Sequence, residues 1–255
     1  MRIRLGSILM LVAALAFGPL AANDLTITFS TKGKGMLGGG KATTEVHYYS
    51  PDHSLVQGVD TKMDSMVDFT KGMTYAIDHK KKTISAISFD DAMAALDELD
   101  AAKGKSGGLG SMMGNLFGDP NDVKVEKGDK ETVAGHECQD WKITVGKLNM
   151  MLAVDPALKM PVPDASYARM IKARATQFAK AGPMGAVWKR LYEEMSKIKG
   201  VPLKTHMTGM MGMDVSSEAT RIDTSAIPAS TFALPDGYTT KDAGKELREQ
   251  LAKAN

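Results

Sequence analysis

Residues 200–238, GVPLKTHMTGMMGMDVSSEATRIDTSAIPASTFALPDGY, contain the pattern that decides the fold. A strand is predicted from Val201 to Thr208, followed by a Gly-containing turn near Met210 to Gly212 and a return strand through Ile222. This stretch therefore predicts an antiparallel hairpin. The end of the stretch predicts a closing edge that places two apolar anchors under the sheet and comprises Phe232, Leu234, Pro235, Gly237 and Tyr238.

The chain before this hairpin predicts more antiparallel strands. Leu25, Ile27 and Phe29 alternate with polar neighbours, and the alternation resumes at 44–49 after a run of glycines at 38–40. Short apolar segments separated by turn residues then predict a meander at 55–56, 66–69, 73–77 and 83–87. Later strands are predicted at 123–125, in a hairpin at 131–145 that turns at Ala134-Gly135, and at 148–154.

Helical periodicity is confined to fewer segments. One helix is predicted at 90–102, before a Gly-rich loop at 103–119, and a helical tail is predicted at 239–255. Residues 156–199 predict an inserted helical hairpin broken at Gly182-Pro183. The fold class is therefore α+β, with one domain at 23–238 in which helices pack on an antiparallel sheet.

The N-terminus has the features of a secretory signal peptide at 1–22. Arg2 and Arg4 precede an apolar run at 8–17, which is too short to cross a bilayer, and small residues follow at Ala21 and Ala22. The only cysteine is Cys138, so the cleavage region lacks the cysteine that a lipoprotein acylates. We expect a periplasmic or secreted protein whose mature chain has no transmembrane segment and no lipid anchor.

Charge and cysteine usage argue against a nucleic-acid-binding protein and against a disulfide-stabilised fold. Removal of Arg2 and Arg4 would bring the formal net charge from +2 to 0, which gives no electrostatic reason to expect a nucleic-acid partner. One cysteine cannot form an internal disulfide, so buried apolar area has to stabilise the fold.

Three motifs resemble a known family: VAGHECQDWKI at 133–143, GVPLK at 200–204 and FALPDGY at 232–238. They are similar to a bacterial secreted family of unknown function (4412), whose fold resembles the lipoprotein carriers LolA and LolB. The resemblance implies a curved antiparallel sheet, a LolA-like incomplete β-barrel, whose concave apolar side is covered by helices and accepts acyl chains. It carries over no catalytic residue, and the helical insertion and Gly-rich loop depart from the LolA pattern.

The leading functional hypothesis is non-enzymatic binding of a lipid, acyl chain or other hydrophobic small molecule in the concave sheet. The sequence contains 19 methionines, whose unbranched thioethers adapt to irregular ligands. Strand parity and helical stripes predict one ligand-binding set drawn from the strands and the covering helices: Trp141, Ile143, Met150, Leu152, Phe178, Trp188 and Leu191. No cofactor is expected.

Two other functions remain open from sequence alone. Thioether and imidazole ligands select Cu(I), so a turn at 210–212 could gather an extracytoplasmic copper site from His206, Met207, Met210, Met211 and Met213. A strand that continued straight would divide this set between two faces. The third hypothesis is a structural or protein-interaction module of the envelope, with the helical insertion as the contact surface for an envelope protein.

Catalysis is not predicted. His136, Cys138 and Asp140 share one face of a strand, but side chains at i and i+2 lie roughly 6 to 7 Å apart, too far for a direct nucleophile–base hydrogen bond. A lone cysteine is usually a small buried apolar residue. No phosphate-binding glycine loop opens a helix.

Overall fold

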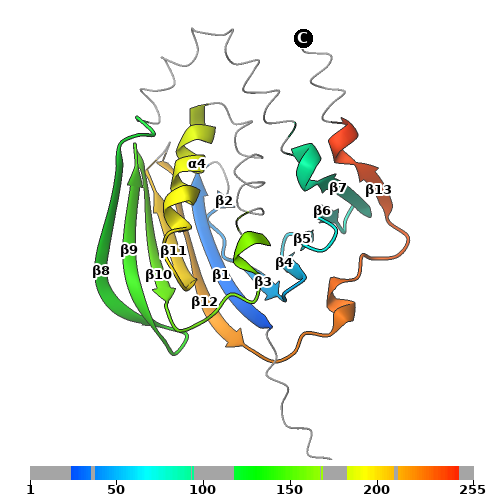
Figure 1. The fold of residues 1–255 in the computed structure, drawn as a ribbon, viewed down its shortest axis with the longest axis horizontal. Helices are drawn as coiled ribbons and strands as arrows, with labels where there is room; N and C mark the ends of the chain where they lie inside the picture. Colours follow the sequence, from blue (N-terminus) through cyan, green and yellow to red (C-terminus); the bar gives the residue numbers. More distant parts are fainter. Residues whose placement is uncertain are drawn as a thin grey trace, which may run out of the picture.

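The computed structural model describes residues 24–35, 38–92, 94, 118–166, 168, 183–209 and 212–246 of the 255-residue chain. Their strands join one 13-stranded sheet in the order β13-β7-β6-β5-β4-β3-β1-β12-β11-β10-β9-β8, with β2 paired to β1 (Figure 1). The sheet is open, because β13 and β8 form its two ends, and the parallel pair β13·β7 is the exception to its antiparallel pairing.

The strands vary in length from two to eleven residues. Their bounds are β1 Leu25–Gly35, β2 Gly38–Gly39, β3 Thr43–Tyr49, β4 His53–Gly58, β5 Met63–Asp68, β6 Met73–Asp78, β7 Thr83–Ser88, β8 Val123–Val133, β9 His136–Val145, β10 Leu148–Asp155, β11 Val201–Thr208, β12 Asp214–Asp223 and β13 Thr239–Asp242. Two further elements are the helix α4 Pro183–Met195 and the 3₁₀ helix η2 Ala229–Phe232.

The hairpin predicted at the start of 200–238 is present as β11 and β12. The two strands pair from Lys204 opposite Glu218 to Thr208 opposite Asp214. β12 then pairs with β1, which in turn pairs with β3. The N-terminal strand therefore joins the C-terminal hairpin to the meander β3–β7 and holds the two halves in one sheet.

Local turn chemistry fixes the other hairpins. Ala134 and Gly135 have φ angles of 49° and 85°, the left-handed backbone at both positions that a two-residue hairpin of type I′ requires. This turn joins β8 to β9 where the sequence predicted it. In the meander, the turns end on Lys62, Gly72 and Lys82, whose φ angles are also positive.

Helix α4 lies inside the curve of the sheet, across the half that contains β9–β12 (Figure 1). Pro183 occupies its first position, where the missing N–H removes no intrahelical bond. The predicted partner stripe at 167–178 lies largely outside the described residues, as do most of the helix predicted at 90–102 and the loop at 103–119. Within the described part of the chain, no helix is long and apolar enough to cross a membrane.

The closing segment, residues 224–238, crosses the sheet on the side opposite α4. It forms η2 instead of a strand, and its Phe232 and Tyr238 pack against a cluster that contains Leu55, Met66 and Tyr75. Two apolar anchors under the sheet were predicted, and these two residues take that place. Beyond the closing segment, the tail expected to be helical from 239 begins instead as β13.

Histidines from the meander hold the closing segment. The Tyr238 hydroxyl lies 2.9 Å from His79 Nδ1, and His79 Nε2 lies 2.8 Å from Asp64 Oδ2. At the other end, the His53 ring stacks on Phe232 with centroids 5.0 Å apart. The segment is therefore attached to β4, β5 and the β6–β7 turn by both polar and aromatic contacts.

We expect Tyr238→Phe to lower the free energy of unfolding by about 1 kcal/mol, the usual net value of one hydrogen bond. It should also speed amide exchange in β13, which begins at the next residue. Urea denaturation and hydrogen exchange measure the two effects. Asp236→Asn, a change at an exposed residue of the same segment, should stay within about 0.5 kcal/mol of the wild type. Equal stability and exchange in Y238F would show that the hydroxyl anchors nothing.

Candidate functional site

A continuous apolar row crosses the sheet beneath α4. The register aligns Ile143 of β9 with Met150 of β10, Met150 with Met207 of β11, and Met207 with Val215 of β12. Because side chains directly opposite in neighbouring strands share a face, all four lie on the side of the sheet that faces α4. We call this side the inner face and the opposite side the outer face.

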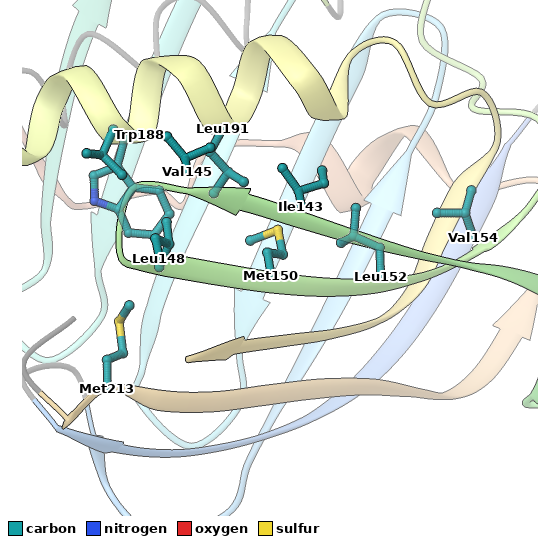
Figure 2. Packing of buried hydrophobic residues seen from close by; sticks show 10 residues of the cluster. Ile143, Val145, Leu148, Met150, Leu152, Val154, Trp188, Leu191 and Met213 are labelled. Atoms are coloured by element: carbon teal, nitrogen blue, oxygen red, sulfur yellow. The ribbon is translucent and has the colours of Figure 1, made fainter. Parts of the chain in front are cut away.

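The residues of α4 complete this inner-face cluster. Val187 and Leu191 are 0% exposed, and Trp188 is 6% exposed. Figure 2 shows Trp188 and Leu191 directed from the helix toward the strands. The buried members of the α4 cluster are Ile143, Val145, Leu148, Met150, Leu152, Val154, Val187, Trp188, Leu191 and Met213.

The structure brings together six of the seven side chains that the sequence predicted as ligand-binding. Ile143, Met150, Leu152, Trp188 and Leu191 are members of the α4 cluster, and Trp141 packs against it while remaining partly exposed. Phe178 lies outside the described residues. These six side chains pack against one another between the sheet and α4. Ligand binding by them therefore stays a prediction.

Partly exposed apolar side chains surround the buried cluster. They come from both layers, with Tyr192, Met195 and Ile198 on or just after α4 and the others on the strands. The full rim comprises Val123, Trp141, Tyr192, Met195, Ile198, Met207 and Val215. A rim of this kind leaves apolar surface accessible to solvent beside the buried cluster.

Sequence reasoning missed a polar row on the same inner face. Glu45, His47 and Tyr49 of β3 face the same side as Phe29, Ile27 and Leu25 of β1, their register partners. His47 Nε2 lies 3.2 Å from Glu45 Oε2, and Nδ1 lies 3.1 Å from the Tyr49 hydroxyl. The available signal was the i, i+2, i+4 spacing of these three residues, which places them on one face.

The described members of the predicted copper set do not converge. His206 lies on the outer face, where its Nε2 is 2.9 Å from Asp214 Oδ1, whereas Met207 and Met213 belong to the α4 side. Met210 and Met211 lie outside the described residues. Within the described chain, no three His, Cys, Asp or Glu side chains gather as they would around a metal ion.

Cys138 is a buried structural thiol. Burial, followed by the nearby charges of Asp155 and Glu131, raises the pKa of Cys138 to about 11, so the reactive thiolate is disfavoured. The His136 ring contacts Asp155, with Nδ1 2.8 Å from Oδ2, while the Cys138 thiol donates to the His136 carbonyl at 3.7 Å. The structure thus pairs the imidazole with a carboxylate and leaves the thiol out of that pair.

The outer face carries a separate hollow of about 350 Å³ beside the closing segment. Thr26, Thr28 and Tyr48 line it together with the Arg221–Asp223 ion pair, whose N···O distance is 3.1 Å. This hollow lies on the opposite side of the sheet from the α4 cluster, because Tyr48 is adjacent in β3 to the inner-facing His47 and Tyr49.

Comparison with known families gives a match over residues 36–238, which cover most of the chain. The chain belongs to the family described as Domain of unknown function (DUF4412). The family predicted from the three motifs is therefore confirmed. No curated protein shows significant similarity to this DUF4412 protein.

Several solved structures resemble the DUF4412 chain at low identity. PNGF-II matches at 11% identity with a TM-score of 0.43, over 91% of this chain and 33% of its own, so the chain spans about a third of that protein. An uncharacterized conserved protein from Thermus thermophilus matches at 6% identity and a TM-score of 0.43, over 87% of this chain and 91% of its own.

A LolA superfamily protein from Nitrosomonas europaea is also similar. It matches at 6% identity and a TM-score of 0.33, over 85% of this chain and 92% of its own. TM-scores below 0.5 describe a coarse likeness, so the functional argument for the DUF4412 chain rests on its own residues.

Proposed function

We propose that this protein is a non-enzymatic binding protein of the bacterial envelope, secreted through its N-terminal signal, which holds a hydrophobic or amphiphilic ligand on the inner face. The observation that supports the proposal is the apolar row from β9 to β12 beneath a single described helix, bordered by partly exposed apolar side chains. An acyl chain placed between the rim and α4 would remain in contact with apolar atoms along its length.

The side chains at this place suit a ligand of irregular shape. Met150, Met207 and Met213 contribute three thioethers to the cluster or its rim, and methionine has three rotatable bonds with which to adapt its shape. Burial of each methylene of an acyl chain contributes about 0.8 kcal/mol, so contact along a chain supports binding without a charged clamp. The proposal therefore requires α4 to shift and admit the chain, because its side chains now contact the sheet.

The proposal is tested with protein stripped of bound lipid, by titration with a fluorescent fatty acid and by native mass spectrometry of protein as purified. We expect a stoichiometric complex. Met207→Gln, a polar change at the rim, should weaken binding of the fluorescent fatty acid about tenfold. The acyl chain would displace water from the glutamine amide and offer it no hydrogen bond in return.

Met151→Gln is the matched control. Met151 is the next residue to Met150 in β10 but faces outward and is 51% exposed. This variant should bind the probe as the wild type does. Absence of co-purified lipid together with absence of probe binding would rule out the carrier proposal. Equal weakening in both variants would show that the probe does not lie on the inner face.

A further inference from the structure

The polar row on β3 is a built feature of the inner face. The Glu45–His47–Tyr49 row is joined side chain to side chain, and the His47 ring also packs on Phe29 with centroids 4.7 Å apart. The side chain of His47 is 20% exposed and that of Glu45 is 36% exposed. The imidazole is therefore fixed by three neighbours, and the carboxylate at the end of the row stays accessible.

Glu45 is the negatively charged end of this row. The hydrogen bond from His47 lowers the pKa of Glu45, which keeps the side chain as a carboxylate. A carboxylate cannot donate, so His47 Nε2 supplies the hydrogen of that bond. A carboxylate accepts about four hydrogen bonds, and this one leaves acceptor positions for a ligand.

Strands β11 and β12 carry their charged side chains on the outer face of the sheet, away from the polar row. In β11 and β12, the register places Lys204, Asp214, Glu218, Arg221 and Asp223 on the outer face. β1 faces the row with Leu25, Ile27 and Phe29. Glu45 thus lies next to an apolar surface, where a charge interacts more strongly with a ligand than it would in open water.

The polar row and the α4 cluster lie at opposite ends of one apolar strip. The sheet order from β3 to β10 is β3-β1-β12-β11-β10, which makes four steps between neighbouring strands. At about 4.8 Å per step, strand β3, which carries Glu45 and His47, lies roughly 19 Å across the sheet from strand β10, which carries Met150. Apolar side chains of β1, β12 and β11 fill the interval, including Phe29, Ala219 and Leu203. Because these three side chains are at most 7% exposed, a long alkyl chain that extends across this strip with its polar end at β3 has to displace the side chains that cover it.

We propose that the Glu45–His47–Tyr49 row binds the head group of the ligand, and that the preferred ligand is a long-chain amphiphile with an ammonium head. This inference rests on the proposed function, since it assigns the polar end of the same ligand. The ammonium donates to the Glu45 carboxylate, while the alkyl chain runs over β1 and β12 toward α4. His47 and Tyr49 position the carboxylate.

The experiment compares three probes that share one alkyl chain and differ in the head group: hexadecylamine, hexadecanol and palmitate. Each displaces a neutral fluorescent alkyl probe from the full mature chain at pH 7, below its aggregation concentration. We expect hexadecylamine to bind at least about tenfold more tightly than palmitate, because at pH 7 the Glu45 carboxylate attracts the ammonium and repels the carboxylate of palmitate. Glu45→Gln should reduce this ratio to within about twofold and leave hexadecanol unchanged.

Glu218→Gln is the matched control, since Glu218 is a glutamate on the outer face of β12, two strands from β3. It should retain the wild-type preference. Wild-type preference for palmitate, or a preference for the amine that survives in E45Q, would overturn the head-group assignment while leaving the carrier proposal intact. Failure of all three probes to bind would overturn the carrier proposal, and the assignment with it. Thermal denaturation of each variant establishes that it is folded.

Discussion

Leu191→Ala is expected to lower the free energy of unfolding by about 3 kcal/mol. Leu191 is 0% exposed and points from α4 toward the strand that contains Ile143 and Val145 (Figure 2). Truncation removes three buried carbon atoms and leaves a cavity. The strands beneath α4 are hydrogen-bonded to neighbours on both edges, so they cannot readily move to close it. Urea denaturation followed by far-UV circular dichroism measures the change.

Lys189→Ala provides the control on the same helix, because Lys189 is exposed. We expect K189A to remain within about 0.5 kcal/mol of the wild type. If L191A and K189A proved equally stable, α4 would not be docked as the structure shows. The apolar contact between α4 and the sheet, on which the proposed ligand site depends, would then be in doubt as well.

Local patterns in the sequence predicted most of the sheet. The alternation at Leu25, Ile27 and Phe29 indicated β1, and the Ala134-Gly135 pair indicated a hairpin turn, because both signals depend on a few adjacent residues. The place of β1 between β3 and β12 was not predictable in this way. The pairing of Ile27 with Ile222 joins residues distant in the chain, and no local property of either strand selects its partner.

β13 shows why short exposed strands escape prediction. Its four residues, Thr239–Asp242, are all exposed and contain no apolar alternation. Its parallel pairing with β7 follows from where the closing segment delivers the chain after Tyr238, and the Thr239 N–H donates to the Lys82 carbonyl at 3.0 Å. The helical periodicity of the tail could not reveal this.

Part of the candidate site could likewise be predicted from local patterns, and part could not. The register places Trp141, Ile143, Met150 and Leu152 on one face, as strand parity in β9 and β10 predicted. In β3, however, parity makes Val46 and Tyr48 the more apolar face, although the structure turns the face of His47 and Tyr49 inward. Only the pairing with β1 shows which face turns inward, so the polar row became visible only in the structure.

Asp68 is a buried carboxylate of the meander that makes several polar contacts. It is 2% exposed at the end of β5, and its Oδ1 accepts hydrogen bonds from the Thr70 hydroxyl at 2.6 Å and the Lys71 amide at 2.9 Å. Lys71 Nζ lies 3.0 Å from Oδ2, and His53 Nε2 lies 3.7 Å from the same atom. Because His53 also stacks on Phe232, Asp68 supports both the β5–β6 turn and the anchor of the closing segment.

We expect the stability difference between wild type and Asp68→Asn to shrink by about 2 kcal/mol as the pH falls from 6 to 2. Burial by itself would raise the pKa of Asp68, but the hydrogen bonds from Thr70 and Lys71 and the Lys71 charge lower it from 3.8 to about 2. A carboxyl group with a depressed folded-state pKa stabilises the protein above its unfolded-state pKa. That contribution is lost as the pH falls from near 5 through 2, where the folded-state carboxylate is protonated.

Urea denaturation of both proteins at a series of pH values between 6 and 2 measures this difference directly. Other carboxyl groups titrate in both proteins, so the subtraction isolates Asp68. An asparagine oxygen still accepts a hydrogen bond but carries no charge, so D68N should be the less stable protein at pH 6 and should approach the wild type at pH 2. Parallel pH profiles would mean that Asp68 titrates alike in the folded and unfolded chains, and that its contacts in the β5–β6 turn do not favour the ionised form.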